Sequence, residues 1–436
     1  MYPLTDRIAD LSMIWKQVSL IFPYFDQKTV DWDKEYTYFL EKVMNTASPL
    51  NFHLLMAEFV NLLGDGHTDY SLPLSMINER GHLPFTLRMV ENEYCIDSII
   101  PDHAAHLGQT VISLNGTPFC EVLDSLSRYT YHVDGYIPSY RLRQLLPFAA
   151  KQCSNMLQTS SGSFGFDLLP EKPLSFVKQP LKPRSPYQSI GSGKLDMRIF
   201  DRNILYVRLD DFKYRSAATE ISTALSNMPN IQGMIIDIRE NIGGMTFNGA
   251  EVAKLLIGGK FSACKKRTRS MTGVDFASAS QLMRWREEDI QKHIAAGLST
   301  REEIEESKNL LQNMHFDHYT DEFGDETHVA QFKGPCILLT SRYTLSAAED
   351  FVAMFKTNKR ATIVGTRTSG TTGTPLLQTF KCGGRLRVCS VGYKLLDNTK
   401  FIGCGIEPDV FCALTPNAYR HGHDHVLDEA LALLTQ

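Results

Sequence analysis

Apolar and polar positions along the chain change their spacing twice, and each change predicts a different kind of structure. From residues 5 to 63, apolar side chains recur every three or four positions, the period of a helix with one buried face. From 83 to about 182 the apolar runs are short and are broken by turn residues such as Asn115-Gly116, which indicates strands. After a proline-containing stretch at 176–188, apolar strands alternate with helices, as in an α/β layer. The predicted regions are an N-terminal helical segment (1–75), a β-rich domain (76–190) and an α/β core (191–436).

The predicted core consists of buried strands, several of which lead into helices. We expect strands at 195–200, 204–209, 234–238, 336–340 and 362–365, and helices at 217–226, 346–355 and 426–434. A charged, helix-prone run at about 278–328 interrupts this rhythm, and a capping box that begins at Thr300 supports a helix within it. We interpret this run as a helical insertion.

Composition narrows the class of protein. A chain of 436 residues is long enough for two or three domains, and its 43% hydrophobic and 22% charged residues are ordinary for a globular protein. A net charge of -4 offers no basic field for nucleic acid, and no apolar run reaches the roughly 20 residues of a membrane span. The nine cysteines show no metal-ligand spacing, and the N-terminus shows no export signal. We expect a cytoplasmic protein; export of a form that has lost its signal stays open.

One predicted strand-turn-helix segment, 334–355, places a serine at the start of a helix. Ser346 would lie beside backbone N–H groups that have no partner inside the helix, near the positive end of the helix dipole. Such a position favours negative charge on the serine oxygen. Serine is also a common N-cap residue without any catalytic role, so the segment alone leaves both interpretations open.

A second segment, 233–256, leads from a buried strand through Gly243-Gly244 into a helix. Paired glycines let the backbone come close to a substrate and point N–H groups at a carbonyl oxygen, as an oxyanion hole requires. A tight turn without catalytic function is the alternative. Asp237 and Arg239, at the end of the strand, fit a structural charge pair.

A third segment, 62–70, ends a helix near Gly64 and presents His67 in a polar loop. Histidine can accept the proton of a hydroxyl and then donate it to a leaving amine, which are the two proton transfers of acyl transfer. The neighbouring Asp65 and Asp69 either orient the ring or solvate the loop.

Together the three segments resemble the serine peptidase family of C-terminal processing proteases and tricorn core proteases, with its retinoid-binding relatives. The resemblance rests on GDGHT (64–68), IDIRENIGG (236–244), SAAE (346–349), GTRTSG (365–370) and GIEPD (405–409), in matching order and spacing. It implies an α/β core of the ClpP/crotonase-like spiral kind and a PDZ-like β-rich domain. It also implies that Ser346 is the nucleophile, and that Gly243 or Gly244, together with Ala347, donates N–H groups to the oxyanion.

The resemblance distinguishes two ways of activating the serine. The processing-peptidase branch uses a lysine downstream of the serine, but Thr371 and Thr372 stand in that region and no lysine occurs between Arg360 and Phe380. The tricorn-like branch uses a histidine instead, and His67 matches it. We therefore expect a serine-histidine pair.

The third member of the catalytic set is less clearly marked. The tricorn-like branch has a hydroxyl residue just before the histidine and a glutamate late in the chain. Here Gly66 precedes the histidine, and Ile402 stands where the glutamate is expected. Glu407 is the nearest acid and is the candidate that the resemblance implies.

These observations predict a serine-type endopeptidase or peptidase that acts on a peptide or protein substrate and needs no metal or organic cofactor. Two alternatives stay open. One is a peptide- or small-ligand-binding protein that keeps the fold without catalysis. The other is acyl-CoA chemistry on the same core, which would leave the serine and the histidine without a role. Self-association into a homo-oligomer is expected by analogy with the family.

Overall fold

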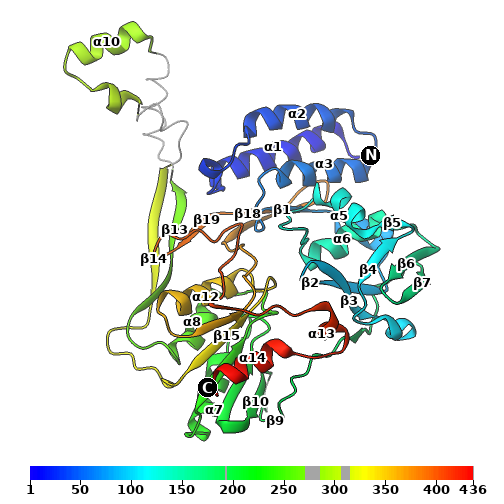
Figure 1. Ribbon diagram of the computed structural model, residues 1–436. Coiled ribbons are helices and arrows are strands. Elements are labelled where there is room, and N and C mark those ends of the chain that lie inside the picture. Colours follow the sequence, from blue (N-terminus) through cyan, green and yellow to red (C-terminus); the bar gives the residue numbers. More distant parts are fainter. Residues whose placement is uncertain (192–193, 271–284, 306–314, 436) are drawn as a thin grey trace.

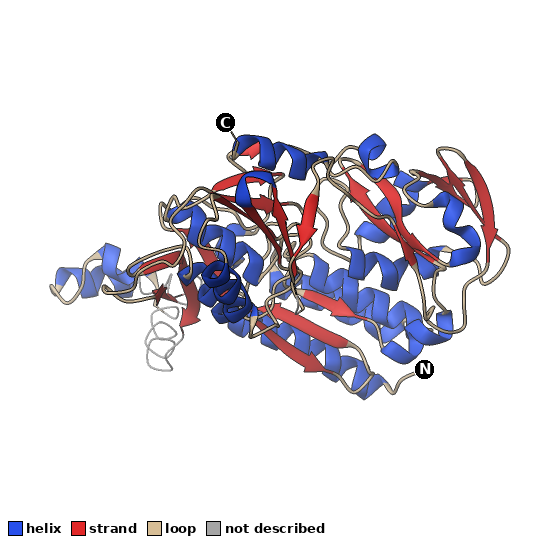
Figure 2. Ribbon diagram, turned by 90° about the horizontal axis from the view of Figure 1, so that it is seen from below, coloured by secondary structure: helices blue, strands red, loops and turns tan. Residues whose placement is uncertain are grey.

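The computed structural model describes residues 1–191, 194–270, 285–305 and 315–435, and Figures 1 and 2 show it from two directions. Helices and several sheets are mixed throughout, which confirms the predicted α/β class. The two ends of the chain lie far apart in both views. Within the described ranges, no helix has the length and apolar character needed to cross a bilayer.

A seven-stranded sheet forms the centre of the predicted core, in the order β20-β16-β15-β12-β11-β10-β9. Its strands are β9 (Tyr187–Ser189), β10 (Asp196–Phe200), β11 (Ile204–Arg208), β12 (Gly233–Asp237), β15 (Cys336–Thr340), β16 (Thr362–Gly365) and β20 (Val410–Phe411). The strands from β11 to β20 pair in parallel, and β10 is antiparallel to both of its neighbours. Parallel pairing brings the carboxyl ends of β12 and β15 to one edge, where α/β proteins usually hold their ligands.

Alternate side chains of the central strands pack against helices on opposite faces. Met234, Ile236 and Leu338 belong to a cluster with the helices α7 (Ala217–Asn227), α8 (Thr246–Lys254) and α12 (Ala347–Thr357). Ile235 and Ile337 face the other way, into a cluster with α14 (His425–Leu433). Because both faces are covered, these strands carry uninterrupted apolar runs, the feature by which the sequence predicted them.

The N-terminal helices do not form a region apart from the core. They are α1 (Leu4–Ile21), α2 (Trp32–Asn45) and α3 (Pro49–Asn61), and their apolar faces share a cluster with β18 (Arg385–Cys389) and the segment before it. The short strand β1 (Asp69–Ser71), which follows α3, pairs with β18, and β18 pairs with β17 (Pro375–Thr379). This pairing anchors the loop between α3 and β1, which contains His67, to the C-terminal half of the chain.

The region predicted to be β-rich contains two small sheets, β2-β3-β8 and β5-β4-β6-β7. Their strands are β2 (Phe85–Val90), β3 (Glu93–Ile99), β4 (Val111–Leu114), β5 (Thr117–Pro118), β6 (Asn155–Thr159), β7 (Gly162–Phe166) and β8 (Val177–Lys178). The predicted Asn115-Gly116 turn joins β4 to β5, with positive φ at both residues. Three helices also lie in this part of the chain: α4 (Leu74–Arg80), α5 (Phe119–Ser127) and α6 (Ser139–Ala149). The strand pattern predicted for this region is wrong at 119–127, where the buried Phe119, Val122 and Leu126 follow helical spacing.

A two-stranded ribbon projects from the body of the molecule, with helix α10 (Glu287–Ala295) at its far end (Figure 1). The ribbon consists of β13 (Phe261–Ser270) and β14 (His315–Phe323), and β19 (Val391–Leu395) pairs with the other edge of β13. The capping box at Thr300 is confirmed, because its N–H and the side chain of Glu303 bond at 2.8 Å and the reciprocal bond is 3.2 Å. The predicted insertion at 278–328 is thus partly strand; its residues 278–284 and 306–314 lie outside the described residues.

Candidate active site

Ser346 lies in the turn between β15 and α12, in a backbone conformation that few serines adopt. Its φ is 60° and its ψ is -133°, so the residue precedes the helix without continuing it. Its side chain makes no capping bond to the helix, and its N–H donates to the carbonyl of Thr371 at 2.8 Å. A strained backbone of this kind costs about 1–3 kcal/mol and is typical of functional turns. The hydroxyl is therefore free for a partner outside the helix.

That partner is His67. Its Nε2 lies 3.0 Å from Ser346 Oγ, although the two residues are 279 positions apart in the chain. His67 is buried, with 3% of the residue exposed. The structure thus brings together the serine and the histidine that the sequence singled out.

The opposite nitrogen of the ring meets a residue that the sequence did not single out for this role. His67 Nδ1 lies 2.6 Å from Thr371 Oγ1, on the loop that follows β16. Glu407, the acid implied by the resemblance, does not occupy this place: its side chain is exposed, and its backbone carbonyl accepts a bond from Lys356 Nζ at 2.7 Å. Thr371, and not Glu407, is thus the neighbour of Nδ1, and a catalytic role for Glu407 stays a prediction.

The two aspartates that flank the histidine stabilise its loop and have no recorded hydrogen bond to the ring within the described residues. Asp65 accepts a 2.7 Å bond from Thr68 Oγ1. Asp69 forms an ion pair with Arg387 on β18, and the same guanidinium donates to the carbonyl of Gly66 at 2.8 Å. The β1–β18 pairing and these bonds fix the position of His67 relative to the core.

The protonation state of His67 follows from its surroundings. Burial and the nearby Arg387 guanidinium lower the pKa of the ring to about 3, against the opposing effect of the Asp69 carboxylate. Near pH 7 the ring is therefore neutral and able to accept a proton. The protonated ring is costly in this site, so any group that orients or stabilises it matters for catalysis.

The glycine loop between β12 and α8 packs directly against the serine. A Cβ on Gly243 would lie 2.6 Å from Ser346 Cβ, which makes glycine obligatory there at a φ of +90°. Its N–H already donates to the side chain of Asn241 at 2.8 Å. Among the described residues, no bond is recorded for the N–H of Gly244 or for that of Ala347, the first residue of α12. Within the described residues, the amides of Gly244 and Ala347 are therefore available to a ligand, whereas that of Gly243 is already bonded.

A buried glutamate lies behind the loop that carries Thr371. Glu349, in the first turn of α12, has no exposed surface and accepts bonds from Thr368 Oγ1, from the N–H of Gly370 at 2.8 Å and from the N–H of Thr371 at 2.6 Å. Burial raises the pKa of this carboxyl to about 8, although the three donors act in the opposite direction. The sequence did not single out Glu349, although its place in SAAE, close to the serine, was the available signal.

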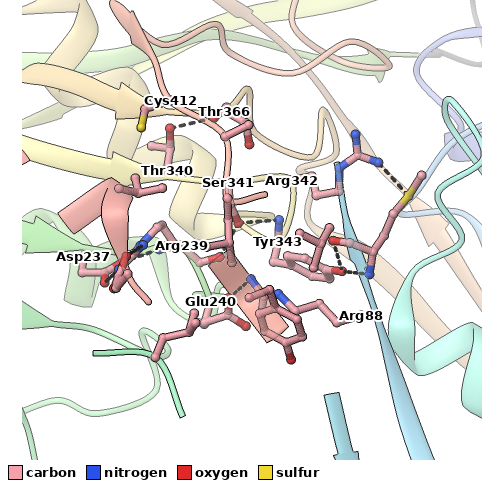
Figure 3. A pocket seen from close by; sticks show the side chains of 18 of the residues that line it. Arg88, Asp237, Arg239, Glu240, Thr340, Ser341, Arg342, Tyr343, Thr366 and Cys412 are labelled. Atoms are coloured by element: carbon pink, nitrogen blue, oxygen red, sulfur yellow. Dashed lines mark hydrogen bonds and ion pairs between the residues drawn. The ribbon is translucent and has the colours of Figure 1, made fainter. Parts of the chain in front are cut away.

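A cavity of about 660 Å³ lies beside the segments that follow β12 and β15, but Ser346 and His67 are not among the residues that line it. Figure 3 shows its side chains, with Asp237 and Arg239 close together and Arg88 near Tyr343. The charges are paired: Arg239 binds Asp237 at 2.6 Å and Asp424 at 2.7 Å, and Arg88 binds Glu240 at 2.5 Å. The expected Asp237–Arg239 charge pair is thus present.

Comparison with known proteins finds similarity to one peptidase family and to several solved structures. A model described as "Peptidase family S41" matches residues 203–411. A Chlamydia trachomatis serovar D protein described only as "Protein" is 32% identical over 110 residues, and the match covers 24% of this chain but only 18% of that protein. Among solved structures, mature CPAF complexed with lactacystin is similar with a TM-score of 0.73, 15% identity and coverage of 99% of this chain and 98% of that one. Mature CPAF alone gives a TM-score of 0.71 at 15% identity, covering 98% and 96%. At this identity the likeness concerns the fold.

Proposed function

We propose that this chain, whose residues 203–411 match the model of peptidase family S41, is a member of that family and hydrolyses peptide bonds through an acyl-enzyme on Ser346, with His67 as the general base. The observation that supports this mechanism most directly is the 3.0 Å contact between His67 Nε2 and Ser346 Oγ. A neutral imidazole at that distance can take the hydroxyl proton as the oxygen attacks.

The reaction proceeds in two halves. Ser346 Oγ attacks the carbonyl carbon of the scissile bond while its proton passes to His67 Nε2. The carbonyl oxygen, now negative, receives hydrogen bonds from the N–H groups of Gly244 and Ala347. The protonated ring then gives its proton to the leaving amine, and a water molecule repeats the sequence on the ester and releases the acid.

A polypeptide substrate is supported by exposed apolar side chains around the glycine loop. Ile242, Met245 and Phe247 are 55%, 62% and 61% exposed. Apolar side chains grouped at a surface indicate a binding site. In our proposal they contact side chains of the substrate next to the scissile bond.

The test combines a substitution with a chemical probe. We expect Ser346→Ala to lower kcat on a fluorescently labelled protein substrate by at least about 10,000-fold and to abolish labelling by a fluorophosphonate. Ser369→Ala is the matched control, because this serine lies on the nearby loop and its hydroxyl has no recorded bond within the described residues. It should keep both activity and labelling.

The binding-protein alternative gives a different result. A wild-type chain that folds, binds peptides and is neither labelled nor active would favour it over catalysis. Full activity in Ser346→Ala would remove Ser346 from the mechanism.

A further inference from the structure

The nitrogen of His67 that faces away from the serine needs a hydrogen-bond acceptor. For Nε2 to accept a proton from Ser346, the hydrogen of the neutral ring must be on Nδ1. Thr371 Oγ1 lies 2.6 Å from Nδ1 and is the recorded partner of that nitrogen in the described part of the chain. Its side chain is 4% exposed, so water is poorly placed to substitute for it.

Thr371 also binds the nucleophile's own backbone. Its carbonyl accepts the N–H of Ser346 at 2.8 Å, while its hydroxyl meets the base that activates the same serine. One residue therefore sets the distance between the two reacting groups from both sides. Such double anchoring is what a positioning residue requires, because small displacements of a base cost large factors in rate.

Thr371 is itself held in place by Glu349. The N–H of Thr371 donates to Glu349 Oε2 at 2.6 Å, and the N–H of Gly370 donates to Oε1 at 2.8 Å. Glu349 is on α12, the helix that begins directly after Ser346. The loop that orients the base and the helix that carries the nucleophile are thereby joined by one carboxyl group.

We propose that Thr371 is the third member of the catalytic arrangement, a positioning residue whose hydroxyl orients His67 and whose backbone Glu349 fixes. This inference rests on the proposed roles of Ser346 and His67. Thr371 takes the place that the resemblance had led us to expect for Glu407.

The residue before the histidine explains why the hydroxyl comes from elsewhere in the chain. A Cβ at Gly66 would lie 2.5 Å from Thr371 Oγ1 and 2.8 Å from Thr371 Cβ. The backbone of Gly66 is not in the left-handed region, so crowding by Thr371, and not conformation, excludes a side chain there. The space that a hydroxyl residue before the histidine would use is filled by the hydroxyl of Thr371.

The charge of Glu349 adds a pH dependence to this arrangement. The carboxyl, with its pKa raised to about 8 by burial, is surrounded by Asp350 on its own helix and by Tyr131, Cys264 and Cys404 from other segments. Above that pH the carboxylate accepts charge-assisted bonds from the Thr371 loop, which are stronger than neutral ones. Below it, the protonated carboxyl holds the loop less tightly.

Removal of the threonine hydroxyl is the first experiment. We expect Thr371→Val to lower kcat by roughly 10- to 100-fold with little change in KM, because Nδ1–H loses its acceptor in a buried site. Thr371→Ser should recover kcat to within about threefold of wild type, since it restores the hydroxyl. Thr371→Ala replaces the valine variant if the latter does not fold, with the same expected loss.

Thr372→Val is the matched control. Its hydroxyl is also buried, one residue along the same loop, but it donates to Asp350 at 3.0 Å and has no recorded bond to the ring. It should lose stability without the kcat effect. If Thr371→Val keeps kcat within about threefold of wild type while Ser346→Ala is inactive, the inference about Thr371 is overturned and the proposed function stands. Full activity of Ser346→Ala would instead overturn both.

The second experiment measures kcat against pH for the wild type and for Glu349→Gln. Because burial raises the pKa of Glu349 to about 8, we expect the wild-type kcat to rise with pH around an inflection near that value, and the glutamine variant to lose the inflection. His67, with a pKa of about 3, contributes no inflection in this range. An inflection that persists unchanged in Glu349→Gln would overturn the role of this carboxyl.

Discussion

Two sides of the segments that follow β12 and β15 can be compared: the side of the candidate site, with Ser346 and His67, and the side of the cavity, whose lining residues do not include these two. On the first side, His67 and Glu349 are buried ionisable groups whose recorded hydrogen bonds are to hydroxyls and backbone amides. On the second side, around the cavity of Figure 3, Asp237 is bound by Arg239, and Arg88 is bound by Glu240. On the first side, Asp69 pairs with Arg387, but His67 and Glu349 themselves have no recorded contact with an opposite charge within the described residues. On the second side, Asp237 and Arg88 are each in an ion pair.

The pKa values reflect this contrast. Burial alone would raise the pKa of Asp237, but Arg239 outweighs burial and brings it down to about 2. Within the described residues, Glu349 is bonded to a hydroxyl and to backbone N–H groups instead of an arginine or lysine, and burial raises its pKa to about 8. An ion-paired group keeps one protonation state across the working pH range and stabilises the fold. A buried group that has no ion pair, and whose pKa is near 7, can instead take part in proton transfer.

The largest expected effect is on the side of Ser346 and His67. We expect His67→Gln to lower kcat by at least about 10,000-fold, because the glutamine side chain is roughly the right size but cannot accept the serine proton. The substitution should also change the dependence of unfolding free energy on pH. In the wild type the folded ring resists protonation, so stability is lost as pH falls from the ordinary histidine value of 6.5 towards 3. Denaturant titrations at several pH values should show that the variant loses less unfolding free energy than the wild type as the pH falls. An equal loss in both would contradict the lowered pKa of His67.

On the side of the cavity the expected effect is on folding instead. Asp237 accepts bonds from Arg239 and from Tyr206 Oη, so Asp237→Asn breaks a buried pair and should cost about 3–5 kcal/mol of unfolding free energy. The folded-state pKa of Asp237 is depressed, so its contribution is present above the unfolded value of 3.8 and is lost as pH falls towards 2. Chemical denaturation gives the cost, and the kcat of the remaining folded enzyme should stay within about tenfold of wild type. Loss of activity with full stability would break the contrast between the two sides.

The sequence located the groups that have distinctive chemistry. Ser346, His67 and the Gly243-Gly244 loop stand in recognisable stretches, and the structure brings them together. The buried strands were equally visible, because both of their faces are covered and their apolar runs are continuous. The features that could be predicted are those that short motifs and continuous apolar runs reveal.

The sequence could not assign the roles that depend on contacts between distant segments. Thr371 reaches His67 across 304 positions, and a threonine hydroxyl carries no sequence signature. Its only signal was that a threonine stands in the region where the lysine of the other branch is expected. The hydrogen bond from the N–H of Gly243 to the side chain of Asn241 could not be predicted either, because it depends on the conformation of the loop. The packing of the N-terminal helices on β18 likewise depends on long-range contacts.

A hydroxyl exchange would sharpen the contrast by moving the partner of His67 from one segment to another. Gly66→Ser alone should lower kcat, because its side chain would collide with Thr371. Thr371→Gly alone removes both the hydroxyl and the obstacle. We expect the double variant Gly66→Ser, Thr371→Gly to regain about tenfold in kcat over Thr371→Gly, since one hydrogen bond to the ring is restored. Single-turnover kinetics with the three variants gives the coupling; a double variant no better than Thr371→Gly would mean that the hydroxyl must come from the loop that Glu349 holds.

The smallest expected effect concerns Tyr343, which lines the cavity and also packs in the β-rich region. Tyr343, three residues before the serine, is buried in the apolar cluster of that region, and its hydroxyl accepts the N–H of Met89 at 2.6 Å and donates to the Met89 carbonyl at 3.1 Å. Tyr343→Phe should therefore cost about 1–2 kcal/mol of unfolding free energy, because a buried N–H on β2 loses its acceptor. The catalytic groups on the other side keep their own bonds to Thr371 and Glu349, so kcat should change less than about threefold. Thermal denaturation and kcat are measured for the same variant. A large fall in kcat at unchanged stability would show that the two sides are coupled, and that the bond to β2 helps to set the geometry of Ser346.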